Sequence, residues 1–212
     1  KSRLVSQEEE LKERKRTEAK DDVVVSNTSA KAALSSVKTV LTACHEVSTG
    51  KYKNAFCITR PPGHHAGDAD SAGYCVLSTA AIAARYMVRY HNKKVLIVDF
   101  DVHIGDGTIE VVEGDPNVCY VSIHNTSMYP IGKKRGRKPE EPEVNEDGRH
   151  VLFPINPVPW KSVERRPGSE SEQKDPIRTR AFTVIEYVYI VERTIRALVD
   201  QFGCDFCIVS AG

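Results

Sequence analysis

The chain has 212 residues, of which 40% are hydrophobic and 28% charged, and its formal net charge is +1. This length suffices for one domain with a buried core, and the composition is typical of a globular protein. A net charge so near zero argues against attraction of the whole molecule to DNA or to a membrane surface, and no apolar run is long enough to span a bilayer.

The first half of the chain alternates between helical and extended patterns. Residues 1–20 are mostly charged and predict a solvated N-terminal arm. Four apolar residues at helical spacing, Leu34, Val37, Val40 and Leu41, then predict a helix over residues 29–48. An apolar run predicts a strand over residues 54–59, two prolines predict a loop over residues 60–66, and an alanine-rich segment predicts a helix over residues 75–90.

The second half repeats this alternation. It predicts strands over residues 95–100, 118–123, 150–155 and 206–212, and helices over residues 108–112 and 180–202. Two long polar segments, residues 125–149 and 156–178, are typical of functional loops or solvated chain. The order of elements predicts an α/β fold with three layers, in which helices cover both faces of an open parallel sheet.

The chain contains six cysteines, and most of them lie in apolar runs, which is typical of buried free thiols in a reducing compartment. Cys204 and Cys207 have the spacing of a redox or zinc motif. Because no second cysteine pair accompanies them, a structural role is favoured, and metal or redox chemistry is the alternative.

Polar residues follow the predicted strand over residues 95–100. Asp99, Asp101 and His103 alternate along an extended backbone, so their side chains share one side, and Asp106 follows in a Gly-Asp-Gly turn. Ligands bind at the carboxyl ends of strands in open α/β sheets. One carboxylate and one imidazole can bind a divalent metal ion, and a further carboxylate can orient these ligands.

A second group of candidates is the pair His64 and His65, on the stiff loop after the strand predicted over residues 54–59. Histidine suits acid–base chemistry because its pKa lies near neutrality. A carboxylate on the far ring nitrogen fixes the tautomer, and Asp99 and Asp106 are the candidates for that role.

Several motifs then occur in the order seen in one enzyme family. The segments Arg60–Ala66, Gly73–Cys75, Asp99–Thr108, Tyr120–His124 and Val209–Gly212 resemble those of zinc-dependent histone deacetylases, especially the class II branch, and of the related acetylpolyamine amidohydrolases. The resemblance implies an arginase/deacetylase-like fold and hydrolysis of N-acetyl-lysine amides in histones or other proteins.

The resemblance also implies roles for individual residues. Asp101 and His103 match two of the three zinc ligands of the family. His65 matches the general base, with Asp106 behind it. His64 matches the electrostatic partner of that base, hydrogen-bonded to Asp99.

Further positions match binding sites of the family. The positions that hold a structural K⁺ in the family, several of them through backbone oxygens, match Asp99, Asp101, His103, Ser122 and Ile123. Gly73 and Tyr74 match the wall of the acetyl-lysine tunnel, and Asp22, or its neighbour Asp21, lies where the family holds the substrate backbone.

The chain also departs from the family pattern. The third zinc ligand and the catalytic tyrosine of the family follow the last predicted strand, beyond Gly212. We therefore expect residues 21–212 to be a partial catalytic domain, with its C-terminal part missing and with little or no deacetylase activity of its own. Ile104 stands where the family usually has a second histidine, and Tyr74 replaces the usual phenylalanine.

Two other functions stay open, a catalytically dead binding module in a corepressor-like complex and an acetylpolyamine amidohydrolase. The basic segment 132–139 favours a solvated loop, with nuclear import or minor-groove DNA contact as alternatives. Because the acidic run 140–146 offsets its charge, direct DNA binding is disfavoured. The family resemblance implies acetylated proteins as partners, no membrane association, and a location in the nucleus or cytoplasm.

Overall fold

One five-stranded sheet organises the protein. The structure is a computed structural model that describes residues 25–126, 128–130, 142–155 and 183–211. The strands are β1 (Val95–Asp99), β2 (Val118–His124), β3 (Glu143–Val144), β4 (His150–Pro154) and β5 (Phe206–Ser210). Their order in the sheet is β3-β4-β2-β1-β5. All neighbours are parallel except β3, which runs antiparallel to β4.

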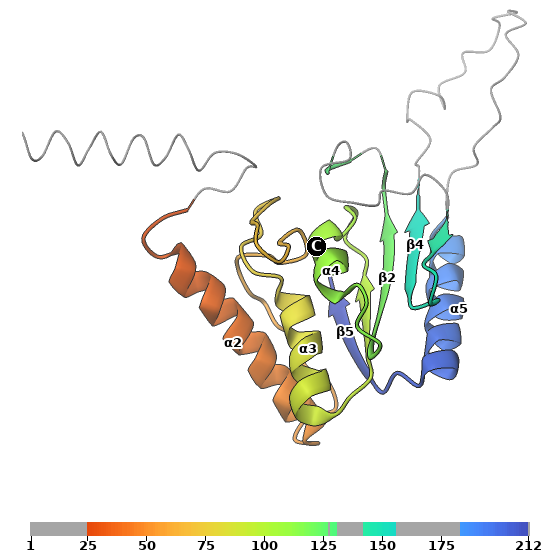
Figure 1. Ribbon diagram of the computed structural model, residues 1–212, viewed down its shortest axis with the longest axis horizontal. Coiled ribbons are helices and arrows are strands. Elements are labelled where there is room, and N and C mark those ends of the chain that lie inside the picture. Colours follow the sequence, from red (N-terminus) through yellow and green to blue (C-terminus); the bar gives the residue numbers. More distant parts are fainter. Residues whose placement is uncertain (1–24, 127, 131–141, 156–182, 212) are drawn as a thin grey trace, which may run out of the picture.

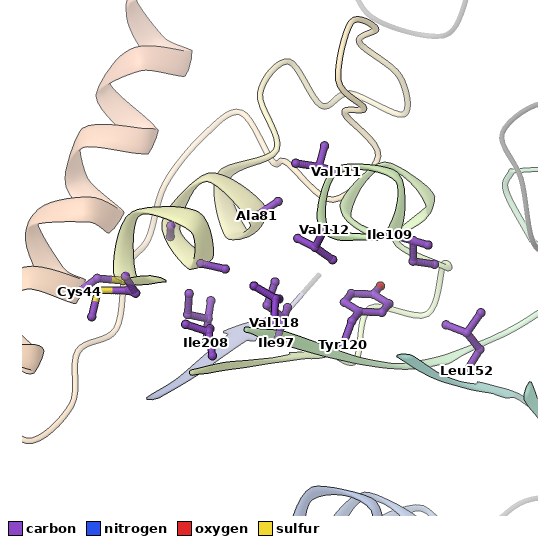
Figure 2. Close-up of a cluster of buried hydrophobic side chains, with 14 of the residues drawn as sticks. Cys44, Ala81, Ile97, Ile109, Val111, Val112, Val118, Tyr120, Leu152 and Ile208 are labelled. Atoms are coloured by element: carbon purple, nitrogen blue, oxygen red, sulfur yellow. The ribbon is translucent and has the colours of Figure 1, made fainter. Parts of the chain in front are cut away.

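Helices cover both faces of this sheet. They are α2 (Ser29–Ser48), α3 (Thr79–His91), α4 (Asp106–Val112) and α5 (Val184–Phe202). Helices α3 and α4 lie on one face, α2 packs against α3 on the outside, and α5 lies on the opposite face (Figures 1 and 2). The predicted three-layer α/β/α architecture is therefore confirmed, with β3 as an antiparallel addition at one edge.

The alternation of side chains along the central strands builds two cores. Val95 and Ile97 of β1 face α3 and α4, where they join the apolar cluster drawn in Figure 2. Leu96 and Val98 face the other side, where they pack with Leu198 of α5. All residues of β1 and β2 are buried because both faces of the sheet are covered.

The strand predicted over residues 54–59 does not form. This segment has no regular structure, and Phe56 and Ile58 are 87% and 90% exposed. A strand needs a neighbour for its backbone N–H and C=O groups. Among the described residues, β5 is the last strand on its side of the sheet, and no strand pairs with residues 54–59.

Two helix boundaries follow from local chemistry. Helix α3 begins at Thr79 rather than at residue 75, and the preceding residue Ser78 has φ −72° and ψ 78°, which lie outside the helical region. Helix α5 begins at a capping box formed by Thr183 and Glu186 and ends at Gly203, whose φ is 66°. In the described part of the chain, no helix has the length and apolar character needed to cross a membrane.

Candidate active site

The carboxyl ends of β1 and β2 lie at the same edge of the sheet. Their register pairs Asp99 with Ser122, so the polar residues that follow each strand begin at the same level. Helix α4 begins at Asp106, immediately beyond these strand ends. The loop that carries His64 and His65 docks on α4, where the Thr108 N–H donates to the His64 carbonyl oxygen at 3.0 Å. The two groups of candidates found in the sequence therefore meet at one place.

His64 forms a buried pair with Asp99. The distance between His64 Nδ1 and Asp99 Oδ2 is 3.1 Å, and the Asp99 side chain is fully buried. Burial disfavours protonation of His64, but the hydrogen bond and charge of Asp99 outweigh it, with smaller contributions from Asp101 and Asp106. The pKa of His64 is therefore raised.

Tyr120 is a further member of this group. Its hydroxyl donates to Asp99 Oδ2 at 3.1 Å, the same oxygen that contacts His64. Burial raises the pKa of Tyr120 well above its ordinary value, so the phenol keeps the proton that it donates. The sequence motif included Tyr120 without assigning it a role. The available signal was a tyrosine in a fully buried strand, which needs a hydrogen-bond partner.

Replacing Tyr120 with phenylalanine is expected to lower the free energy of unfolding by about 1.5–3 kcal/mol, because a buried carboxylate loses one of its donors. Chemical denaturation of the 212-residue chain measures this change. Tyr90→Phe is the matched control, since Tyr90 is 66% exposed and should change stability by less than about 0.5 kcal/mol. An equal effect of the two substitutions would contradict a role for the Tyr120 hydroxyl.

His65 forms the second buried pair, with Asp106. The distance between His65 Nδ1 and Asp106 Oδ1 is 2.6 Å, and both residues are 3% exposed. Burial lowers the pKa of His65, and the hydrogen bond to Asp106 opposes this only in part. A neutral His65 that donates from Nδ1 to Asp106 carries its lone pair on Nε2, as a general base requires.

The rings of His64 and His65 lie 4.0 Å apart between centroids, and the His103 ring lies 5.8 Å from that of His65. Asp101 Oδ1 lies 2.7 Å from His103 Nδ1 and accepts the His103 backbone N–H at 2.8 Å. These contacts, with burial as the opposing effect, lower the pKa of Asp101. The Asp101 carboxylate and the His103 imidazole therefore lie next to each other, beside the two His–Asp pairs.

Asp101 and His103 are donors of the types that zinc binds, but they are fewer than a catalytic zinc site needs. Asp101 and His103 offer one oxygen and one nitrogen, and both are ordinary zinc donors. Catalytic zinc takes three protein ligands. No cluster of three or more potential ligands occurs in residues 25–126, 128–130, 142–155 and 183–211. In these ranges, Asp101 and His103 are therefore two potential zinc donors, one fewer than a catalytic zinc site takes.

One side of this centre is lined by Gly73 and Tyr129. A Cβ on Gly73 would lie 2.4 Å from His65 Cδ2, so only glycine fits there. The Tyr129 ring stands nearly perpendicular to that of His65, at 4.8 Å between centroids. Tyr74 is 68% exposed beside them. Tyr129 was not predicted, because it follows a polar stretch without periodicity.

The remaining site predictions have different outcomes. Ser122 and Ile123 lie in β2, where the Ser122 hydroxyl contacts His124 Nδ1 at 3.1 Å. Asp21 and Asp22, the arm over residues 1–20 and the basic segment 132–139 lie outside the described residues.

The chain is similar to known proteins in sequence and in fold. The family model of the histone deacetylase domain matches residues 2–212. Histone deacetylase HDA1 of Candida albicans is 34% identical over 204 residues, which are 93% of this chain and 22% of that protein. The solved structure of the HDA15 HD domain has a TM-score of 0.68 and 29% identity, and the match covers 90% of this chain and 48% of that one.

An acetylpolyamine aminohydrolase from Burkholderia pseudomallei is also similar, with a TM-score of 0.63 and 28% identity over 86% of this chain and 46% of its own. The chain therefore spans about half of the solved domains that it resembles. It spans about a fifth of the curated yeast relative.

Proposed function

The chain belongs to the histone deacetylase family, and from this premise we propose that its site serves the zinc-dependent hydrolysis of N-acetyl-lysine amides in histones or other proteins. The observation that carries the proposal is the convergence of two buried His–Asp pairs on the Asp101–His103 pair. An amide is a poor electrophile with a poor leaving group. Its hydrolysis needs a polarised carbonyl and a group that moves a proton in each direction.

The proposed roles follow from these contacts. Asp101 and His103 would hold zinc, which supplies a Lewis acid that polarises the amide carbonyl and makes water more acidic. His65 accepts a proton at Nε2 and returns it to the leaving amine, while Asp106 holds its Nδ1–H. His64, whose pKa is raised by its contact with Asp99, lies beside His65 as its electrostatic partner.

We propose that the substrate binds on the side of the site that Gly73 and Tyr129 line. Gly73 and Tyr74 would form one wall for the methylene stem of an acetyl-lysine, and Asp22 would hold the substrate backbone. We also propose a structural K⁺ bound by Asp99, Ser122 and Ile123, because the register of β1 and β2 places Asp99 beside Ser122. Acetylated proteins in the nucleus or cytoplasm would be its partners, and a corepressor complex is a further proposed partner.

Release of acetate from an acetyl-lysine peptide tests the proposed reaction. Because the proposed zinc site has two ligands among the described residues, Asp101 and His103, we expect the 212-residue chain to release little or no acetate. A longer polypeptide that adds the rest of a deacetylase domain is expected to release it with zinc present, and His65→Ala should abolish the release. Zinc-dependent hydrolysis that His65→Ala leaves unchanged would contradict the proposed role of His65.

Acetylspermidine is the second candidate substrate, because a relative that matches 86% of this chain is described as an acetylpolyamine aminohydrolase. Comparison of kcat/KM for acetylspermidine and for an acetyl-lysine peptide, with the same longer polypeptide, separates the two classes. The proposal predicts the higher value for the peptide.

A further inference from the structure

Two histidines meet where helices α2 and α3 end. His45 lies in the last turn of α2, and His91 is the last residue of α3. The two helices pack against each other and run in the same direction, so their final turns lie together at the lower end of Figure 1. His45 Nδ1 is 3.3 Å from His91 Nε2. Two imidazole nitrogens from separate helices therefore lie side by side.

The distances between the two rings fit two ligands of one metal ion. A zinc ion that binds each nitrogen at about 2.0–2.1 Å, with a tetrahedral angle between them, separates the nitrogens by about 3.3 Å and the ring centroids by about 5.2 Å. The observed distances are 3.3 Å between the nitrogens and 5.1 Å between the centroids. A straight N–H···N hydrogen bond of the same length would place the centroids about 5.6 Å apart. The rings are thus angled toward a shared point beside the two nitrogens.

The surroundings of this point favour a cation. The last carbonyl groups of a helix carry partial negative charge, and here the last turns of two helices meet. His45 is exposed and His91 is half-buried, so an ion can reach both rings from solvent. Neutral imidazole is a common ligand of zinc and of other divalent transition metals.

Both rings are carried by packed helices. His45 adjoins Cys44, which belongs to the same buried cluster as Met87 of α3. The Tyr86 ring of α3 is tilted against the His91 ring, at 5.4 Å between centroids. Because the two ligands are already in position, metal binding requires little further ordering of the chain.

We propose that His45 and His91 are a divalent-metal site, with zinc as the expected ion, that fastens α2 to α3. His45 Nδ1 and His91 Nε2 bind the ion through their lone pairs, and the proton of each neutral ring lies on its other nitrogen. In the part of the chain that the structure describes, no third histidine, cysteine or carboxylate joins them. The other coordination positions are therefore open to water.

This two-histidine site is separate from the candidate active site. His91 precedes the first residue of β1, Val95, whereas Asp101 and His103 follow its last residue, Asp99. The two sites thus lie at opposite ends of this strand and share no residue. The proposal does not depend on the proposed deacetylase chemistry.

A Zn²⁺ titration of the Asp101→Asn variant of the 212-residue chain tests the proposal, because this substitution removes a ligand of the proposed catalytic site. Long-range ¹H–¹⁵N NMR follows the ring nitrogens. We expect Zn²⁺ to shift the signals of His45 Nδ1 and His91 Nε2 together, along one binding curve. Zinc should also raise the thermal unfolding midpoint, because the two ligands come together only in the folded chain.

His45→Ala and His91→Ala, each in the same Asp101→Asn background, provide the decisive comparison. Each should weaken zinc binding at the remaining ring by about 100-fold, because a lone histidine lacks the second ligand held beside it. Each should also remove the effect of zinc on the unfolding midpoint. Tyr90→Phe is the matched control, since Tyr90 adjoins His91, is 66% exposed, and should change neither measurement. Zinc that leaves both rings unshifted, or that shifts His45 equally with and without His91, would overturn the proposal.

Discussion

Replacing Gly107 with alanine is expected to lower the free energy of unfolding by about 2–3 kcal/mol, although alanine favours a helix over glycine by about 1 kcal/mol. Gly107 lies in the first turn of α4, where a Cβ would come within 2.4 Å of the Ala66 carbonyl oxygen and 2.5 Å of the His65 carbonyl carbon. These contacts are with backbone atoms, which cannot rotate away. The loop of His64 and His65 must therefore move off the helix.

Chemical denaturation measures this loss, and the ring resonances of His65 report the movement of the loop. Gly50→Ala is the control, because Gly50 has a φ of 78° and nothing within 4 Å of an added Cβ. It should cost only the backbone strain of a left-handed alanine, about 1 kcal/mol. If Gly107→Ala were no worse than Gly50→Ala, the close docking of the histidine loop on α4 would be contradicted.

Replacing Asp106 with alanine is expected to lower the free energy of unfolding by about 1.5–3 kcal/mol, since the buried Nδ1–H of His65 loses its charged hydrogen-bond acceptor. The contact between them is 2.6 Å, and both residues are 3% exposed. Asp106 also stands in the first turn of α4, where a negative charge is favourable. NMR of the His65 Nδ1–H should show the loss of its strong hydrogen bond.

Asp200→Ala provides the comparison, because Asp200 is an exposed carboxylate on α5 and its removal should change stability by less than about 0.5 kcal/mol. Asp106→Asn keeps the shape of the side chain and removes its charge. Its effect therefore separates the contribution of the negative charge from that of the side-chain contact with His65. An Asp106→Ala variant as stable as Asp200→Ala would mean that the pair contributes nothing to the fold.

The central strands were predictable because their apolar runs are bounded by glycine, proline and charged residues. β1 and β2 begin where the sequence predicts, and α2 has the predicted bounds. Residues 54–59 have the same kind of apolar run but form no strand, since strand formation depends on a neighbour that periodicity does not reveal. The pair Glu143–Val144 is too short for any pattern to indicate a strand.

The position of Asp99 and Asp106 in the sequence made both candidates to hold a histidine ring, but their assignment to His64 and His65 came from the family resemblance, and the contacts in the structure agree with it. The contacts of Tyr120 with Asp99 and of Tyr129 with His65 could not be predicted, because they depend on which side chains meet in the folded protein.

We propose that Asp101 and His103 form part of a zinc site beside the two His–Asp pairs. A Zn²⁺ titration of the 212-residue chain at neutral pH, followed through the NMR signals of its seven histidine rings, tests this proposal. His45 and His91 provide an internal comparison, because their ring nitrogens lie 3.3 Å apart on α2 and α3, away from the site.

We expect Zn²⁺ to shift the His103 ring signals, Asp101→Asn to remove this shift, and His91→Ala to leave it in place. If Zn²⁺ shifts only the signals of His45 and His91 and leaves His103 unchanged, Asp101 and His103 are not zinc ligands.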